Sequence, residues 1–241
     1  VNHVVRVWNG GLVTINETLK LSAEQGVEVP PLEEFRLGLP EEYAPHIEYC
    51  YAYEGSNPSM RLQVAPNASL GRLGFYGLRV TFPQPVDISH GGSYRFTVIL
   101  FLSGLISPEG EDTLQLNFPL YPSLLQDASV CYVRVIFPST VGRFNSSLAR
   151  EGLPYNLTST PTLRIFNHEV RPLSRFAYKP AWITFKPIEP FKIFTIDEMV
   201  HEVTVNEWGQ LIISDSYQIT NLGGTGFSTF DLQLPPGAYN I

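Results

Sequence analysis

Four asparagines in this 241-residue chain stand in the acceptor pattern for N-linked glycosylation: Asn, any residue but Pro, then Ser or Thr. They are Asn16, Asn67, Asn145 and Asn156. Asn145 and Asn156 are the best candidates, because they fall in segment 138–161, whose composition predicts a long loop where a glycan stays solvated. Asn16 qualifies only if it faces solvent from its strand. In the alternative interpretation, all four are ordinary polar residues of turns and strands.

Side chains that could catalyse a reaction or hold a metal ion are not grouped in the sequence. The five histidines have no spacing typical of metal ligands, and His201–Glu202 lacks a second histidine at helical distance. The acidic segment Glu109–Asp112 could bind calcium, but a solvated acidic turn is far more common. No nucleophile is paired with a base, and no carboxylates are suitably placed for glycoside hydrolysis. The sequence therefore predicts a protein that is not an enzyme and has no cofactor or metal.

The two cysteines, Cys50 and Cys131, both fall inside strand-like segments. They can form one disulfide bond in an oxidising compartment or remain two buried thiols, and the sequence leaves both open. Val1 leads directly into a strand, as expected of a chain from which a secretory signal has been removed. With the glycosylation pattern, this favours an extracytoplasmic location, in the endoplasmic reticulum lumen or at the cell surface.

The composition is that of a globular β protein, and it narrows the range of partners. Charged residues make up 16% of the chain and aromatic residues 12%, with 20 prolines and 19 glycines. The formal net charge of -7 and the lack of a Lys/Arg cluster argue against nucleic acid and anionic membrane surfaces. The apolar run Phe96–Ile106 is too short to cross a bilayer, so a membrane contact would need residues outside this sequence. Proteins and N-linked glycans remain as expected partners.

Alternating apolar and polar residues predict strands along most of the chain. The predicted strands are Val4–Trp8, Leu12–Leu21, Phe35–Leu39, Ile47–Tyr53, Met60–Val64, Gly77–Phe82, Tyr94–Leu102, Leu114–Phe118, Val130–Phe137, Leu163–Phe166 and Trp182–Phe185. The most apolar of them, Tyr94–Leu102, is expected at the centre of a sheet. No long segment has a helical period, and prolines directly after strands fit edge positions. We predict an all-β, antiparallel, sandwich-like fold.

The segment from Met199 to Tyr239 repeats the start of the chain. At one constant offset, His201, Val203, Val205, Gly209 and Ile213 match His3, Val5, Val7, Gly11 and Ile15, with Asp215 on Glu17, Ile219 on Leu21 and Gly224 on Gly26. After a short gap, Phe230–Pro235 matches Phe35–Pro40. Agreement over about forty residues indicates a duplicated domain. We therefore predict an N-terminal β domain over residues 1–195 and the first strands of a second, incomplete copy over residues 196–241.

The second copy is expected to expose apolar side chains. Its predicted strands, Glu202–Val205 and Leu211–Ile219, have few others to pack against, so Leu211 and Ile213 lack partners of their own. Trp208 at the turn either packs as a lid on the hairpin or anchors an interface. An unpaired sheet edge of this kind attracts a strand from another molecule. Trp208, Leu211 and Ile213 are therefore the candidate interface residues.

Two segments resemble ribophorin I, a subunit family of the oligosaccharyltransferase complex. One is Arg79–Asp87 with the strand Tyr94–Leu102 after it. The other, strongest over Met199–Leu211, is Phe194–Ile212, which contains a strand-Trp-Gly-strand element. The start at Val1-Asn2 is also similar to the mature N-terminus of that family. The resemblance implies a non-catalytic lumenal β module of a complex that transfers a lipid-linked glycan to Asn; the family's membrane helix and cytosolic tail are missing from this sequence.

Two functions stay open at this point. The resemblance implies a scaffold or accessory subunit of an N-glycosylation complex, with other subunits of a membrane complex as partners. The alternative is a structural glycoprotein of the cell surface, a lattice or filament subunit that completes its sheet with a strand from a neighbouring copy.

Overall fold

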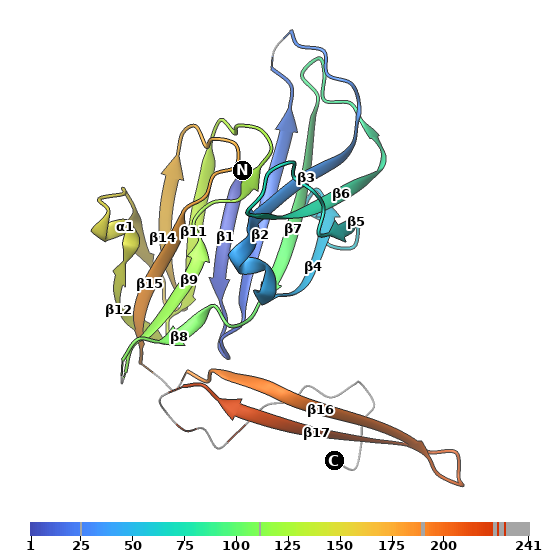
Figure 1. The fold of residues 1–241 in the computed structure, drawn as a ribbon, viewed down its shortest axis with the longest axis vertical. Coiled ribbons are helices and arrows are strands. Elements are labelled where there is room, and N and C mark those ends of the chain that lie inside the picture. The colour runs from blue at the N-terminus through green and yellow to red at the C-terminus, as the bar shows by residue number, and fades with distance from the viewer. Residues whose placement is uncertain (25, 111, 189–190, 224–225, 227–228, 230–241) are drawn as a thin grey trace.

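The computed structural model describes residues 1–24, 26–110, 112–188, 191–223, 226 and 229, and most of its regular structure is β-strand (Figure 1). The predicted all-β class is confirmed. Helical structure in the described residues is limited to the 3-10 turn η1 (Glu41–His46) and the short helix α1 (Ser147–Arg150). Gly224 and Phe230–Pro235, which extend the sequence repeat, lie outside the described residues.

The first layer is a sheet of eleven strands. In spatial order they are β10 (Ser123–Leu124), β3 (Leu32–Pro40), β6 (Phe75–Val86), β5 (Arg61–Pro66), β4 (Ile47–Glu54), β7 (Ser93–Leu102), β2 (Val13–Ser22), β1 (Asn2–Val7), β11 (Cys131–Pro138), β14 (Leu163–Val170) and β13 (Asn156–Ser159). The ladders are antiparallel apart from β1–β11, which is parallel. The strand expected at the centre, Tyr94–Leu102, is β7, which pairs with β2 on one side and β4 on the other.

Two groups of strands cover the inner face of this sheet and enclose the core. The β5–β6–β3 end of the sheet curls back, so that Phe35 on β3 and Phe82 on β6 each lie 5.5 Å from Phe96 on β7, measured between ring centroids. A four-stranded sheet lies over β1, β11 and β14 (Figure 1) and consists of β12 (Val141–Ser146), β15 (Pro180–Pro187), β9 (Leu114–Pro119) and β8 (Ile106–Pro108). Phe137 on β11 meets Phe185 on β15 at 5.1 Å. The result is a sandwich whose core is rich in aromatic rings.

Alternation along β2 decides which side chains face this core. Val13, Ile15 and Leu19 are buried, whereas Lys20, the residue after Leu19, is exposed. Burying an aliphatic side chain of this size stabilises the fold by roughly 1.5–3 kcal/mol. Because successive strand residues point to opposite faces, the same alternation turns Asn16 to the outer face of the sheet.

Segment 138–161 is not the long loop that its composition predicts, since it contains β12, α1 and β13. The Ser146 hydroxyl accepts a hydrogen bond from Ala149 N at 3.2 Å and caps the start of α1. β13 exposes all four of its side chains and is held by its main-chain ladder to β14. An edge strand of this kind buries no face, so it leaves no alternation in the sequence for a prediction to use.

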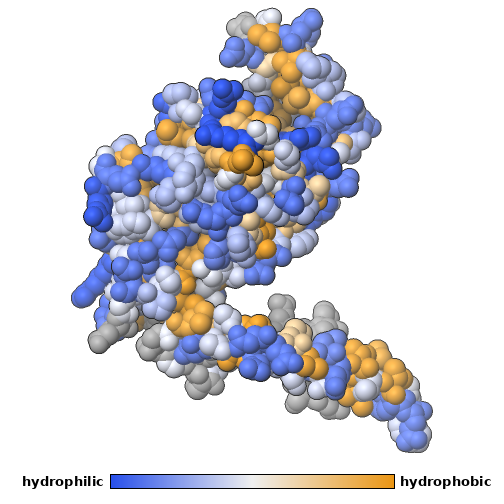
Figure 2. Space-filling view, in the orientation of Figure 1, coloured by the Kyte–Doolittle hydropathy of each residue, from blue (hydrophilic) through white to orange (hydrophobic). Residues whose placement is uncertain are grey.

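β16 (Phe194–Val205) and β17 (Leu211–Asn221) form a two-stranded sheet of their own. Within the described residues, no ladder joins them to the other two sheets. In Figure 1 this hairpin extends away from the sandwich, and Figure 2 shows apolar surface along it. β16 begins next to the domain boundary expected at residue 195. The division into a whole and an incomplete domain stays a prediction.

Candidate functional site

The β16–β17 hairpin repeats the β1–β2 hairpin in register as well as in sequence. In the first hairpin, the cross-strand pairs are His3 with Glu17, Val5 with Ile15, and Val7 with Val13. In the second, the residues at the constant offset occupy the same places: His201 with Asp215, Val203 with Ile213, and Val205 with Leu211. The sequence repeat is therefore a structural repeat of one hairpin.

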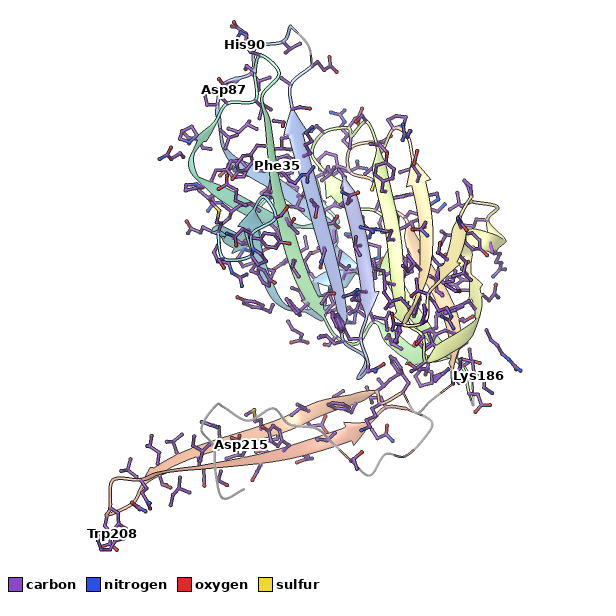
Figure 3. The ribbon with its side chains drawn as sticks, turned by 180° about the vertical axis from the view of Figure 1, so that it is seen from behind. Phe35, Asp87, His90, Lys186, Trp208 and Asp215 are labelled. Carbon is purple, nitrogen blue, oxygen red and sulfur yellow. The ribbon has the colours of Figure 1, made fainter. Side chains whose placement is uncertain are left out.

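The two turns are closed in the same way. Trp8 N donates a hydrogen bond to Leu12 O over 2.9 Å, and the corresponding pair in the second turn does so over 3.0 Å. Gly11 and Gly209 take equivalent places with φ of +83° and +76°, a conformation that favours glycine. Trp208 at the tip of the second turn is 80% exposed (Figure 3). Its ring therefore does not pack as a lid on the hairpin and is free to anchor a contact.

Each hairpin carries a histidine–carboxylate pair on the same face. His3 Nδ1 lies 2.6 Å from Glu17 Oε1, and His3 Nε2 lies 3.0 Å from Pro119 O at the end of β9. A carbonyl oxygen only accepts hydrogen bonds, so Nε2 carries a proton and donates it. A second proton must lie between Nδ1 and Oε1, because neither atom could otherwise donate to the other. This buried pair fastens the first layer of the sandwich to the second.

The duplicate pair has the same internal contact in a different environment. His201 Nδ1 contacts Asp215 Oδ1, and both side chains are partly exposed to solvent. Asp215 lies midway along the hairpin, far from the turn (Figure 3). Among the described residues, no carbonyl takes the place at His201 Nε2 that Pro119 O takes at His3. Within the described residues, the second pair therefore has no layer over it like the one that covers the first.

The whole face that carries the pair follows this pattern. Val5 and Ile15 are 0% and 2% exposed, whereas their equivalents Val203 and Ile213 are both 53% exposed. Leu211 is 68% exposed. We call the exposed apolar side chains on this face of β16 and β17 the apolar patch. It consists of Met199, Val203, Val205, Leu211 and Ile213. The polar pair His201–Asp215 crosses this patch between Met199 and Val203, and exposed apolar surface on one face of a sheet marks an interaction site.

The first hairpin also indicates what the edges of the second are built to accept. β1 pairs along its outer edge with β11 in parallel, and β2 pairs along its outer edge with β7 in antiparallel orientation. Neither β16 nor β17 has a ladder on its outer edge in the described part of the chain. Free main-chain donors and acceptors beside an apolar face bind extended polypeptide. This hairpin is therefore suited to bind an extended polypeptide segment by strand addition.

The four acceptor asparagines lie in unequal surroundings. Asn16 is on the outer face of β2, but its Oδ1 is buried and has no hydrogen-bond partner among the described residues. Asn67 is exposed, with φ of +56°. Asn145 is exposed, but the hydroxyl that completes its pattern belongs to the buried Ser147. Asn156 is exposed on β13.

In the structure the two cysteines are free thiols that form no disulfide bond with each other, and Cys131 is buried whereas Cys50 is only partly buried. Cys50 on β4 and Cys131 on β11 are separated in the sheet by β7, β2 and β1. Four strand spacings amount to roughly 19 Å, far beyond the reach of a disulfide. Burial raises the pKa of Cys131 to about 12, with a further contribution from the Glu17 carboxylate. Burial also raises the pKa of Cys50.

A group of aromatic side chains on the outer face of the large sheet was not predicted. On β4, Tyr51 lies beside both Tyr49 and Tyr53, with ring centroids 5.9 and 6.3 Å apart. The rings of Tyr49 and Tyr51 each lie 6.0 Å from that of Phe101 on β7. Arg61 Cζ lies 3.7 Å from the centroid of the Tyr51 ring, a cation–π contact. Tyrosine at every second position was the available signal, because alternate strand residues share a face.

The described residues contain no group of three or more His, Cys, Asp or Glu side chains that could hold a metal ion. None of their helices is long and apolar enough to cross a membrane.

Comparison with known proteins gives distant similarity alone. No protein-family model matches the sequence, and no curated protein matches it. An aminopeptidase N family protein from Idiomarina loihiensis aligns with 86% of this chain and 30% of its own, at 11% identity and a TM-score of 0.46. An M1 zinc metallopeptidase from Deinococcus radiodurans aligns with 89% of this chain and 45% of its own, at 14% identity and a TM-score of 0.39. The chain thus spans less than half the length of these proteins, and similarity this low carries no argument about function.

Proposed function

We propose that this chain is a non-catalytic, extracytoplasmic β module that joins a protein assembly through the apolar patch of its β16–β17 hairpin. The supporting observation is that the equivalent face of β1–β2, in the same molecule, is buried beneath a second layer. A matching partner presents apolar side chains to the patch and a strand to a free edge. It also presents a main-chain carbonyl to His201 Nε2, as β9 does to His3.

In this proposal the assembly is an N-glycosylation complex, and the chain is a scaffold or accessory subunit of it. The support is the resemblance of Phe194–Ile212 to ribophorin I. That segment comprises β16, the turn with Trp208 and the start of β17. The residues that carry the resemblance are thus largely exposed in the described part of the chain.

Affinity capture of the chain from native membranes tests this function. The wild-type chain is expected to co-purify with a multi-spanning glycosyltransferase, identified by mass spectrometry. Leu211→Lys with Ile213→Lys places two charges on the patch, so the transferase should be lost. Both side chains are already more than half exposed, so folding of the sandwich should not change. Ser214→Lys with Ser216→Lys is the matched control, because these residues alternate to the opposite face of β17. Wild-type chain that recovers no transferase contradicts the proposal.

A structural protein of the cell surface is the second candidate, and it is favoured because no further strand pairs with β16 or β17 in the described part of the chain. Light scattering of the purified chain separates the two functions. Self-association that rises with concentration and disappears in the lysine double variant would favour a lattice or filament subunit. A monomer at all concentrations would count strongly against it.

A further inference from the structure

An open cavity of about 520 Å³ lies at the β13 end of the large sheet. Its walls include Tyr132, Tyr155, Asn156, Asn167 and Glu169. The ladders bring these residues together: Asn156 is opposite Asn167 across β13 and β14, and Tyr132 is opposite Glu169 across β11 and β14. The volume is within the range of roughly 300–1,000 Å³ that is usual for small-molecule sites. One of the four acceptor asparagines is thus part of the wall of a cavity.

Of the four acceptor asparagines, Asn156 has the surroundings in the folded protein that suit a glycan best. Asn156 and Thr158 are both exposed and, two residues apart on a strand, project to the same face. Asn167 Nδ2 donates hydrogen bonds of 3.2 Å to Asn156 O and to Thr158 Oγ1, which orders this short strand. β13 is the last strand of its sheet, so the described chain leaves its outer edge open.

The wall next to Asn156 is held in place by buried groups. His168 Nδ1 donates to Pro154 O at 2.6 Å, since that carbonyl can only accept. His168 Nε2 lies 2.8 Å from the Tyr121 hydroxyl oxygen, within hydrogen-bonding distance. Burial raises the pKa of Tyr121 to about 12, so this hydroxyl keeps its proton at neutral pH. The ring of Tyr155 stacks on Phe166 at 5.7 Å. The cavity is thus formed before any ligand arrives.

We propose that Asn156 carries an N-linked glycan whose first sugar residues lie in this cavity. The donor class is an oligosaccharide joined to a lipid through pyrophosphate. Asn156 Nδ2 forms a bond to the anomeric carbon, and the bond from that carbon to the pyrophosphate oxygen breaks. The lipid pyrophosphate leaves with the electron pair, and the amide gives up one proton to a base of the transferase. The chain needs only to be a substrate of such an enzyme, so this inference is independent of the proposed function.

The side chains of the cavity match the chemistry of a sugar. The half-exposed ring of Tyr132 lines the cavity, and an aromatic face of this kind packs against the C–H bonds of a pyranose; Arg171 Cζ lies 5.8 Å from the centroid of the same ring. Asn167 and Glu169 add an amide and a carboxylate to the wall, groups that hydrogen-bond sugar hydroxyls; Glu169 also pairs with Arg171, and Asn167 Nδ2 with Asn156 and Thr158. A glycan seated here would also cover the open edge of β13, and covered edges do not pair with other molecules.

Secretion of the full chain from insect cells, followed by glycopeptide mass spectrometry, tests occupancy. Asn156 should be occupied in the wild-type chain and in Thr158→Ser, and unoccupied in Thr158→Ala, because the transferase requires the hydroxyl. An unoccupied Asn156 in the folded wild-type chain overturns the proposal.

Release of the glycan by a peptide N-glycosidase tests its seat in the cavity. In the native protein, the Asn156 glycan should be released at least about tenfold more slowly than from the same protein after denaturation and trapping of its thiols. Tyr132→Ala should remove most of that protection, and Tyr132→Phe, which keeps the ring, should retain it. Circular dichroism checks that each variant is folded. Equal rates of release from native and denatured protein would show that the glycan projects into solvent. That result would contradict its placement in the cavity.

Discussion

The histidine–carboxylate pair occurs twice, once buried and once partly exposed to solvent. Comparing the two pairs therefore shows how much burial changes the contribution of such a pair to the free energy of unfolding. His3→Ala leaves the Glu17 carboxyl in the core without its partner and removes the link to Pro119. Breaking a buried pair by removing one member costs about 3–5 kcal/mol. His201→Ala breaks the same contact at the surface, where such pairs contribute less than about 1 kcal/mol. Urea denaturation of the two variants should therefore give very different free energies of unfolding.

Replacing both buried partners is the control for this comparison. His3→Met with Glu17→Met leaves no unpaired polar group, so it should recover much of the stability lost in His3→Ala. Equal stability of His3→Ala and the wild-type protein would show that the buried pair does not fasten the two layers.

At the residue scale, the sequence predicted the two histidines as equivalents but not what they do. The constant offset placed His3 with His201 and Glu17 with Asp215 before any contact was known. The register shows that the members of each pair face each other. The partner at His3 Nε2, Pro119 O, could not be predicted, because it comes from a strand of the other layer and is distant in sequence.

At the element scale, two glycines allow β3 and β6 to lie close to each other and to the segment 68–70 of the same chain. Gly38 and Gly77 face each other across the β3–β6 ladder. A Cβ on Gly77 would lie 2.0 Å from Ala68 O and 2.8 Å from Leu70 Cγ. Gly77→Ala should therefore lower the free energy of unfolding by about 1–3 kcal/mol, as overpacking does. Thermal or urea denaturation measures the loss.

Gly110→Ala is the matched control for this change. A Cβ on Gly110 would meet nothing within 4 Å, so this variant should unfold like the wild-type protein. If Gly77→Ala were as stable as Gly110→Ala, the close approach around Gly77 would not be a constraint on the fold.

Which elements could be predicted depends on whether they bury one face. β2 and β7 alternate or are strongly apolar, and their positions agree with the sequence. The composition of β12, α1 and β13 predicts a loop instead, because main-chain ladders and a serine cap hold these elements with little apolar signal. The curl that brings Phe35 and Phe82 onto Phe96 depends on contacts between distant segments, which local patterns do not report.

At the scale of the whole molecule, the two hairpins should differ in stability although their sequences correspond. β1–β2 is flanked by β11 and β7 and covered by a second layer, whereas β16–β17 is a two-stranded sheet with no neighbouring ladder in the described residues. An isolated two-stranded hairpin is only marginally stable in water. Its apolar patch therefore adds stability only once a partner covers it.

Hydrogen exchange read by mass spectrometry can compare the hairpins within one sample. The amides of Val203–Val205 and Leu211–Ile213 should exchange faster than those of Val5–Val7 and Val13–Ile15, by on the order of 100-fold or more, because local opening is cheap where few contacts are buried. β1–β2 is the internal standard. Addition of the partner captured from native membranes should slow exchange in β16 and β17 and leave β1 and β2 unchanged. Equal protection of both hairpins in the isolated chain would mean that β16–β17 is already covered, and the apolar patch would then not be a docking surface.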